Sequence, residues 1–466
     1  MRLTLILGAV LPTLLGCAGE SPKSAPRNVL LLSIDTLRAD ALGSYGNERR
    51  TSAFLDRWAE RGVRFTSAWS HSPKTAPSHM TMLTGLAPRV HGVGNLRTAS
   101  HPSLGPEATT LAEVLSSEGF ATAGITDGGN MRGRLGFNRG FDVYIAKKAH
   151  EWGPRAAQVR QWLTARDPER PWFLFFHTYH VHDPYFPPQS VAERFVDPDY
   201  AGRIIGQRDA LEKAMETEDL GFGSDPRIRL LANYWERVDE SDPADLEHLR
   251  DLYLASVADL DSKLERLFTW LEAEGHLDST LVIVTSDHGE EFGEHGMVRH
   301  DQLYRELLHV PLLVRFPDDA HAGLVIEEPV RHVDLFASVL ELLEIDLPSD
   351  DVGPSWASWI DSSKRSEPRR ILAEHRSTRE SALDQWSLRD EGWMVYRTPE
   401  ATELFDLGQD PDEQSPSADE AALDRLLSVH DSELERLLEL AEGYTGGTGG
   451  ELSAETRAEL EALGYF

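Results

Sequence analysis

The run NVLLLSID, residues 28–35, decides the class of fold. Residues 28–34 form a nearly unbroken apolar segment, which is typical of a strand buried on both faces of a parallel sheet. A carboxylate, Asp35, follows directly. Ligands of open α/β sheets gather at the carboxyl ends of the strands, so Asp35 stands where a functional site is expected.

Strands and helices alternate on both sides of this run. Further apolar strands are expected at residues 63–68, 121–125, 172–176, 280–285 and 311–316. Amphipathic helices are expected at residues 51–60, 110–118, 156–163, 243–274 and 332–343. This alternation predicts an α/β fold with a mostly parallel central sheet and helices on both faces.

The remaining segments suggest how the chain is divided. Residues 28–348 are expected to form the main domain, within which residues 186–241 read as an insertion that caps the site. Short strands at 371–374, 393–397 and 403–407, with a helix at 418–440, predict a small C-terminal α+β subdomain over 349–442. Residues 443–466 read as a Gly-rich linker and a helical tail.

A second stretch, residues 71–95, has the sequence HSPKTAPSHMTMLTGLAPRVHGVGN. Thr75 lies just ahead of Pro77 and Ser78, which can open a helix, and the unpaired N–H groups of a helix start favour anions. Thr75 is therefore a candidate nucleophile for a phosphate or sulfate ester. Asp35, Asp287 and His288 each follow an apolar strand and could hold a metal that assists it.

Together these blocks resemble the sulfatases of the alkaline phosphatase superfamily. The pattern T-x-P-S-H-x-x-x-L-T-G-x-x-P-x-x-H-G-V is similar to a signature that usually begins with Cys or Ser and carries Arg in place of His79. Matching blocks lie at residues 33–40, 182–185, 286–290, 310–313 and 403–411. The resemblance spans residues 28–411 and implies an alkaline-phosphatase-like α/β/α sandwich that hydrolyses sulfate or phosphate esters.

The resemblance also implies roles for individual residues. His182 matches a position that contacts the transferred ester group, and His300 lies where many relatives have a substrate-binding lysine. His91 and Asn95 match a loop that flanks the substrate, and Asn95 is expected to donate an amide hydrogen bond to an ester oxygen. His79, in place of the orienting arginine, is a further candidate substrate-binding residue.

A divalent metal ion is the expected cofactor. The family supplies two adjacent aspartates from the first block, but here the second is Thr36, which weakens a Ca²⁺ site. Asp35, Asp287 and His288 remain as ligands, which makes Zn²⁺ or Mn²⁺ more plausible than in ordinary sulfatases. Thr75 could complete the ligand set, and the neighbouring Lys74 is expected to help hold it as an alkoxide.

Composition restricts the partners and the compartment. The 466 residues carry a net charge of −32, which argues against nucleic acid as a partner. The single cysteine, Cys17, follows an apolar run in the sequence LLGCA, which resembles a bacterial lipobox. Residues 1–17 are then a lipoprotein signal peptide and 18–27 a linker, although a plain cleaved signal peptide is the alternative. The protein is expected in the bacterial cell envelope, periplasmic or at the outer membrane, with membrane contact through the lipid anchor alone.

Three functions remain open from the sequence. The first is a sulfatase-type hydrolase with a Thr75 nucleophile, acting on a small-molecule or glycan ester. The second is a phosphodiesterase or phosphatase of the same superfamily. The third is a catalytically silent lipoprotein that binds sulfated or phosphorylated glycans. Position 75 is a threonine, and Cys17 is the single cysteine of the sequence. The mature domain therefore has no thiol that could be oxidised to the formylglycine of most sulfatases. The oligomeric state is left open.

Overall fold

The structure is a computed structural model that describes residues 26–94, 102–146, 152–220, 226–361, 369–376 and 384–448. The predicted signal peptide, Cys17, Asn95 and the tail from residue 449 lie outside these ranges. Among the described residues, no helix combines the length and the apolar character that crossing a membrane requires.

The main domain is built on one large sheet. Its strands follow the order β11-β2-β10-β7-β1-β6-β4-β5, and β12 also pairs with β2. Strand β10 runs antiparallel to β7 and β2, whereas β7, β1, β6, β4 and β5 are parallel to one another. The bounds are β1 Asn28–Ile34, β2 Val63–Trp69, β4 Ala121–Thr126, β5 Val143–Ala146, β6 Trp172–Thr178, β7 Thr280–Thr285, β10 His309–Arg315, β11 Leu324–Ile326 and β12 Val330–Arg331.

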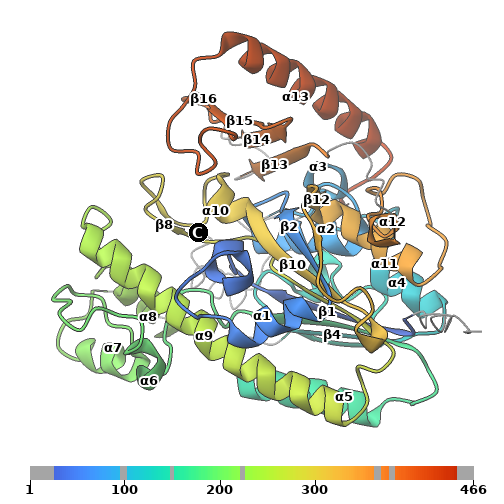
Figure 1. The fold of residues 1–466 in the computed structure, drawn as a ribbon, viewed down its shortest axis with the longest axis horizontal. Helices are drawn as coiled ribbons and strands as arrows, with labels where there is room; N and C mark the ends of the chain where they lie inside the picture. Colours follow the sequence, from blue (N-terminus) through green and yellow to red (C-terminus); the bar gives the residue numbers. More distant parts are fainter. Residues whose placement is uncertain are drawn as a thin grey trace, which may run out of the picture.

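Strand β1 shows why the fold has three layers. Val29 and Leu31 face one hydrophobic core, and Leu30 and Leu32 face another, because successive side chains of a strand point to opposite faces. The predicted α/β class and α/β/α sandwich are thereby confirmed, with helices on both faces of the sheet (Figure 1).

Each face of the sheet has its own set of helices. One core includes residues of α2 Thr75–Thr84, α3 Pro88–His91, α4 Leu111–Ser117, α11 Leu335–Leu342 and α12 Ser358–Asp361. The other includes residues of α1 Ala53–Glu60, α5 Trp152–Ala165, α6 Gln189–Ala192, α7 Arg208–Ala214, α8 Pro226–Trp235 and α9 Pro243–Ala273. Helices α6 to α8 lie within the predicted insertion, and α6 packs against α9 (Figure 1).

The C-terminal subdomain has an antiparallel sheet, as predicted. Its order is β13-β14-β15-β16, with bounds β13 Ile371–Arg376, β14 Asp384–Asp390, β15 Trp393–Arg397 and β16 Thr402–Asp406. Helix α13, Glu420–Ala441, covers this sheet at the top of Figure 1. The first part of the expected linker is held in place: β17 Gly447–Thr448 pairs with β3 Pro102–Ser103, and Thr445 hydrogen-bonds to Glu107.

Short elements complete the described chain. The hairpin of β8 Glu291–Phe292 and β9 Val298–Arg299 follows β7, and α10 Arg305–Leu308 leads into β10. The 3-10 helices are η1 Ala39–Ala41, η2 Gly43–Tyr45, η3 Gly133–Leu135, η4 Pro317–Asp319 and η5 His332–Asp334.

Candidate active site

Three neighbouring strands bring the candidate site together. In the sheet, Ser33 of β1 lies opposite His177 of β6 on one side and Thr285 of β7 on the other. Asp35 and Asp287 each lie two residues beyond this row, at the carboxyl end of the sheet. Although 251 residues separate Thr36 from Asp287, the Thr36 N–H donates to Asp287 Oδ1 at 3.2 Å.

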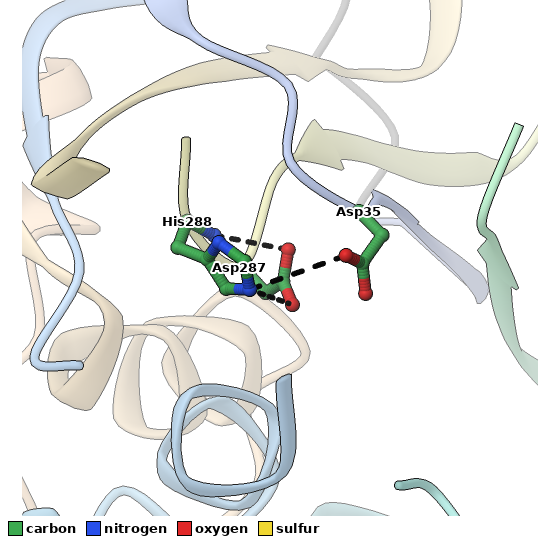
Figure 2. Close-up of side chains that lie close together, drawn as sticks. All are labelled: Asp35, Asp287 and His288. Atoms are coloured by element: carbon green, nitrogen blue, oxygen red, sulfur yellow. Dashed lines mark hydrogen bonds and ion pairs between the residues drawn. The ribbon is translucent and has the colours of Figure 1, made fainter. Parts of the chain in front are cut away.

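Asp35, Asp287 and His288 form a compact ligand cluster (Figure 2). One ligand atom from each residue lies within 4.8 Å of the others. His288 Nε2 is 3.4 Å from Asp287 Oδ2 and 4.0 Å from Asp35 Oδ1. These three atoms are buried and have no hydrogen-bond partner among the described residues. A divalent cation would satisfy all of them, so the residues present fit the expected metal.

The charges of the cluster support this fit. Burial raises the pKa of Asp35 to about 7, and burial together with the nearby Asp35 raises the pKa of Asp287 well above its ordinary value. Two buried carboxylates side by side therefore need a proton or a cation between them. The second aspartate of the family pattern is replaced by Thr36, which contributes its amide to Asp287 and adopts a left-handed φ of 58°.

Thr75 is the first residue of α2 and is completely buried beside the cluster. The nearby Thr75 side chain lowers the pKa of Asp35 against the effect of burial. The carbonyl of Thr75 accepts a 2.8 Å hydrogen bond from Nδ1 of His79. The structure thus brings the candidate nucleophile and the candidate metal ligands into one site.

His182 is oriented by its neighbour in sequence. Its Nδ1 is 2.6 Å from Asp183 Oδ1, while its Nε2 is buried with no partner among the described residues. Burial alone would lower the pKa of His182, but the carboxylates of Asp183, Asp35 and Glu290 raise it to about 10. His182 is therefore a buried imidazolium whose Nε2–H is available to a ligand.

His300 packs against both His182 and His288, a member of the ligand cluster. Its ring centroid lies 5.4 Å from that of His182 and 4.7 Å from that of His288. Nδ1 of His300 is 2.9 Å from Glu290 Oε1, and the other oxygen of Glu290 accepts a hydrogen bond from the Tyr185 hydroxyl. Burial of Glu290 raises its pKa to about 8.

The remaining predicted residues occupy different places. The ammonium of Lys74 is 2.6 Å from Asp301 Oδ1, so this cation has a carboxylate partner next to Thr75. His79 accepts from the Ser33 hydroxyl at Nε2 and donates to the Thr75 carbonyl at Nδ1. His91 accepts from the Val93 N–H and bonds the Thr81 hydroxyl. Both nitrogens of His79 and of His91 are thus engaged within the protein, and both rings contact α2, the helix of the candidate nucleophile.

Sequence reasoning did not assign three of the contacting residues. His177 lies in β6, and its Nε2 is 3.1 Å from Asp35 Oδ2. Asp183 and Glu290 were part of matched blocks, but no role was assigned to them. A carboxylate adjacent to His182 was the available signal for Asp183, and nothing in the sequence indicates that Glu290 reaches His300.

Comparison with known families agrees with this geometry. A family model described as Sulfatase matches residues 27–345, more than half of the chain. The chain belongs to the sulfatase family. A second model, N-sulphoglucosamine sulphohydrolase, C-terminal, matches residues 293–439 of this sulfatase-family protein. It is thus a hydrolase of ester bonds, in a family whose members are generally metal-dependent.

Individual relatives are distant in sequence but similar over most of their length. The N-acetylglucosamine-6-O-sulfatase of Bacteroides thetaiotaomicron is 22% identical, over 88% of this chain and 86% of that protein. The phosphonate monoester hydrolase of Agrobacterium radiobacter has a TM-score of 0.72 at 21% identity, covering 89% of this chain and 96% of the other. A structure solved with its substrate D-glucosamine-2-N,6-O-disulfate has a TM-score of 0.70 at 19% identity, covering 90% and 98%. The two structures support the alkaline-phosphatase-like fold.

Proposed function

We propose that this sulfatase-family protein hydrolyses sulfate or phosphate esters, with Thr75 as the nucleophile. The observation that supports this most directly is the position of Thr75, which is buried at the first turn of α2 and close enough to Asp35 to lower the pKa of its carboxyl. The N–H groups of that turn favour the anionic ester group. Asp35 is also the carboxylate placed to take the proton of the attacking hydroxyl.

A divalent metal would be held by Asp35, Asp287 and His288, with the hydroxyl of Thr75 as a further ligand. When bound, such an ion polarises the ester oxygens and lowers the pKa of a bound hydroxyl. An imidazole in the ligand set favours Zn²⁺ or Mn²⁺ over Ca²⁺, which prefers oxygen ligands alone.

The protein's own side chains provide the general acid for the first step and the general base for the second. As Thr75 Oγ1 bonds to the central sulfur or phosphorus, the bond to the alcohol oxygen breaks, and His182 Nε2 donates a proton to that oxygen. Asp183 keeps His182 protonated before the reaction. The neutral His182 can then take a proton from the water that hydrolyses the threonyl ester, while the departing Thr75 oxygen takes back the proton held by Asp35, which restores all three residues.

Threonine at position 75 favours phosphoryl transfer. A formylglycine hydrate has a second hydroxyl on the same carbon and can expel its sulfate by C–O cleavage, whereas threonine has no such group. Its ester must be hydrolysed by attack of water on the central atom. We therefore infer that phosphate esters are turned over faster than sulfate esters.

Matched aryl phosphate and aryl sulfate substrates test this inference through their kcat/KM values on the metal-loaded enzyme. The expected result is a higher value for the phosphate. Replacing Thr75 by Ala should reduce the rate about 100-fold or more, as expected for loss of a covalent nucleophile. Thr75→Ser keeps a hydroxyl and is the matched control. A clear preference for the sulfate, or full activity of Thr75→Ala, would contradict the mechanism.

We also propose that Cys17 carries a lipid that anchors the protein in the bacterial cell envelope. The lipobox-like sequence and the short Pro-containing segment after it support this assignment. Fractionation of cells that produce the wild-type chain or Cys17→Ser tests it. Wild-type protein should be found in the membrane fraction and the variant should not; freely soluble wild-type protein would refute the anchor.

A further inference from the structure

Arg299 lies at the edge of the candidate active site in an unusual environment. It ends β9, directly before His300, and its guanidinium carbon lies 4.2 Å from the ring centroid of Trp235 in α8. The side chain of Arg299 is partly exposed, whereas that of Trp235 is buried. The flat guanidinium is thus stacked on an aromatic face that the helical insertion provides.

Trp235 connects this cation to the catalytic groups. Its indole N–H donates to Asp183 Oδ2 at 2.5 Å, and the other oxygen of Asp183 lies 2.6 Å from His182 Nδ1. The positive charge of Arg299 also helps to lower the pKa of Asp183 and of Glu290, against the effect of burial on both groups. Arg299 is therefore one side chain away from the residue that orients His182.

The guanidinium of Arg299 is not within ion-pair distance of any carboxylate among the described residues. No hydrogen bond or ion pair joins it to a carboxylate or carbonyl there, and its Nε is buried without an acceptor. In contrast, the buried Arg38 pairs with Asp40 and Glu294, and the buried Arg155 pairs with Asp127. The nearby carboxylates of Asp183 and Glu290 already accept hydrogen bonds from Trp235 and Tyr185. Because a buried N–H without an acceptor is costly, Arg299 points to an acceptor group supplied from outside.

The backbone conformation of Arg299 is also unusual. Its φ is 74°, in the left-handed region that a residue with a side chain seldom adopts. Such strain persists where the surrounding structure requires it, and it is concentrated at functional sites. Here it occurs at the junction between the β8–β9 hairpin and His300.

We propose that Arg299 binds a second anionic group on the alcohol part of the substrate. This inference rests on the proposed ester hydrolysis and names the class of ester: one that carries a carboxylate or a sulfate besides the group that is cleaved. A stacked guanidinium is already oriented and can bind such a group through two parallel hydrogen bonds. In a chain of net charge −32, it also provides local attraction for a doubly charged substrate.

The test compares aryl phosphates that differ in a single ring substituent: none, a carboxylate or a sulfate. Wild-type enzyme should prefer the charged esters in kcat/KM, and the better of the two identifies the second group. Arg299→Gln should lose about ten- to a hundredfold on the charged esters, mostly through KM, and less than about threefold on the plain ester. Arg299→Lys, which keeps the charge but not the planar fork, should lose an intermediate amount.

Arg160→Gln is the matched control. Arg160 also stacks on a tryptophan, Trp270, at 5.2 Å. Trp270 contacts His276, which precedes β7, so this pair lies toward the opposite end of the sheet from the active site. Arg160→Gln should therefore leave the kcat/KM of each of the three esters unchanged. Equal losses of Arg299→Gln on plain and charged esters would overturn the proposal and assign Arg299 to positioning His182 through Trp235; no loss on either would overturn it as well.

Binding measurements test the role of Arg299 independently of the proposed hydrolysis. If the wild-type enzyme turned over none of the esters, hydrolysis by Thr75 would fail, but calorimetry with the same esters would still decide the role of Arg299. Tighter binding of a charged ester than of the plain one, lost in Arg299→Gln, supports the anion site. Equal affinities, or no measurable binding of any ester, would overturn it.

Discussion

Asp35→Asn should make the metal-free protein more stable at neutral pH, although it weakens the metal site. In the absence of metal, burial raises the pKa of Asp35 from 3.8 to about 7. A carboxyl whose folded-state pKa is raised contributes stability that is fully present below the unfolded pKa. That contribution is lost as the pH rises through the folded pKa. The relevant window is therefore about pH 4 to about pH 7.

The size of the effect follows from the pKa shift. A difference of about three pH units corresponds to roughly 4 kcal/mol in the free energy of unfolding, and Asp287 shares part of it because the two carboxyls are coupled. Asparagine resembles the protonated acid and carries no charge at any pH. Metal-free Asp35→Asn should thus unfold at about the wild-type urea midpoint near pH 4 and at a higher midpoint above pH 7.

The assay is urea unfolding of chelator-treated protein across pH 4–8, with and without added Zn²⁺ or Mn²⁺. Asp261→Asn is a useful comparison, since burial also raises the pKa of Asp261, to about 6, but Asp261 lies away from the cluster and accepts the Phe54 and Leu55 N–H groups of α1. Added metal should stabilise the wild type more than Asp35→Asn. Equal midpoints of wild type and Asp35→Asn at all pH values would refute the argument that two buried carboxylates await a cation.

Three further predictions concern metal retention and proton transfer. His288→Ala and Asp287→Ala should each lose bound metal and turnover while keeping the far-ultraviolet circular dichroism of the wild type; full metal occupancy by elemental analysis in both would remove them as ligands. Asp183→Asn should let the pKa of His182 fall from about 10 to its ordinary value or below, because burial is then opposed by fewer charges. At pH 8 the protonated fraction would drop from nearly all to a few per cent, so kcat/KM should fall about 30-fold at pH 8 but little at pH 5.5; a loss that is the same at both pH values would contradict the acid role of His182. Ser33→Ala removes the hydroxyl that donates to His79 and should lower kcat modestly, by less than about tenfold, without changing metal content; loss of metal in this variant would show that the ring of His79 has a larger role.

The central sheet was predictable because its central strands can be recognised from the apolar pattern of their own residues. Residues 28–34 and 280–285 match β1 and β7 residue for residue, since continuous apolar runs of that length are buried on both faces. The positions of Asp35 and Asp287 then follow from the rule that parallel strands end at a common edge. Strand β14, residues 384–390, was not predicted: its apolar alternation is confined to Trp386 and Leu388 among charged neighbours.

The partners of the site residues were less predictable, because they depend on contacts between distant segments. Thr75, Asp35, Asp287 and His288 were placed together by the family resemblance, and the structure brings them together. The sequence could not show that Ser33 occupies one nitrogen of His79, 46 residues away. Nor could it show that Trp235, in the segment expected to cap the site, reaches Asp183. Such side-chain networks arise from packing, which leaves no periodic pattern in the sequence.

The place of β1 in the sheet has a consequence for how the protein is made. Among the described strands β1 comes first in the sequence, yet it lies in the middle of the sheet, and its partners β6 and β7 follow at residues 172–178 and 280–285. Pairing over such sequence distances is slow, and β1 must remain unpaired on the β7 side until most of the chain has been synthesised. Asp35 meets Asp287 and His288 only when that pairing is complete. A nascent chain that stops before residue 280 therefore lacks β7 and β10 of the central sheet, and it lacks Asp287 and His288 of the cluster that could hold a metal ion.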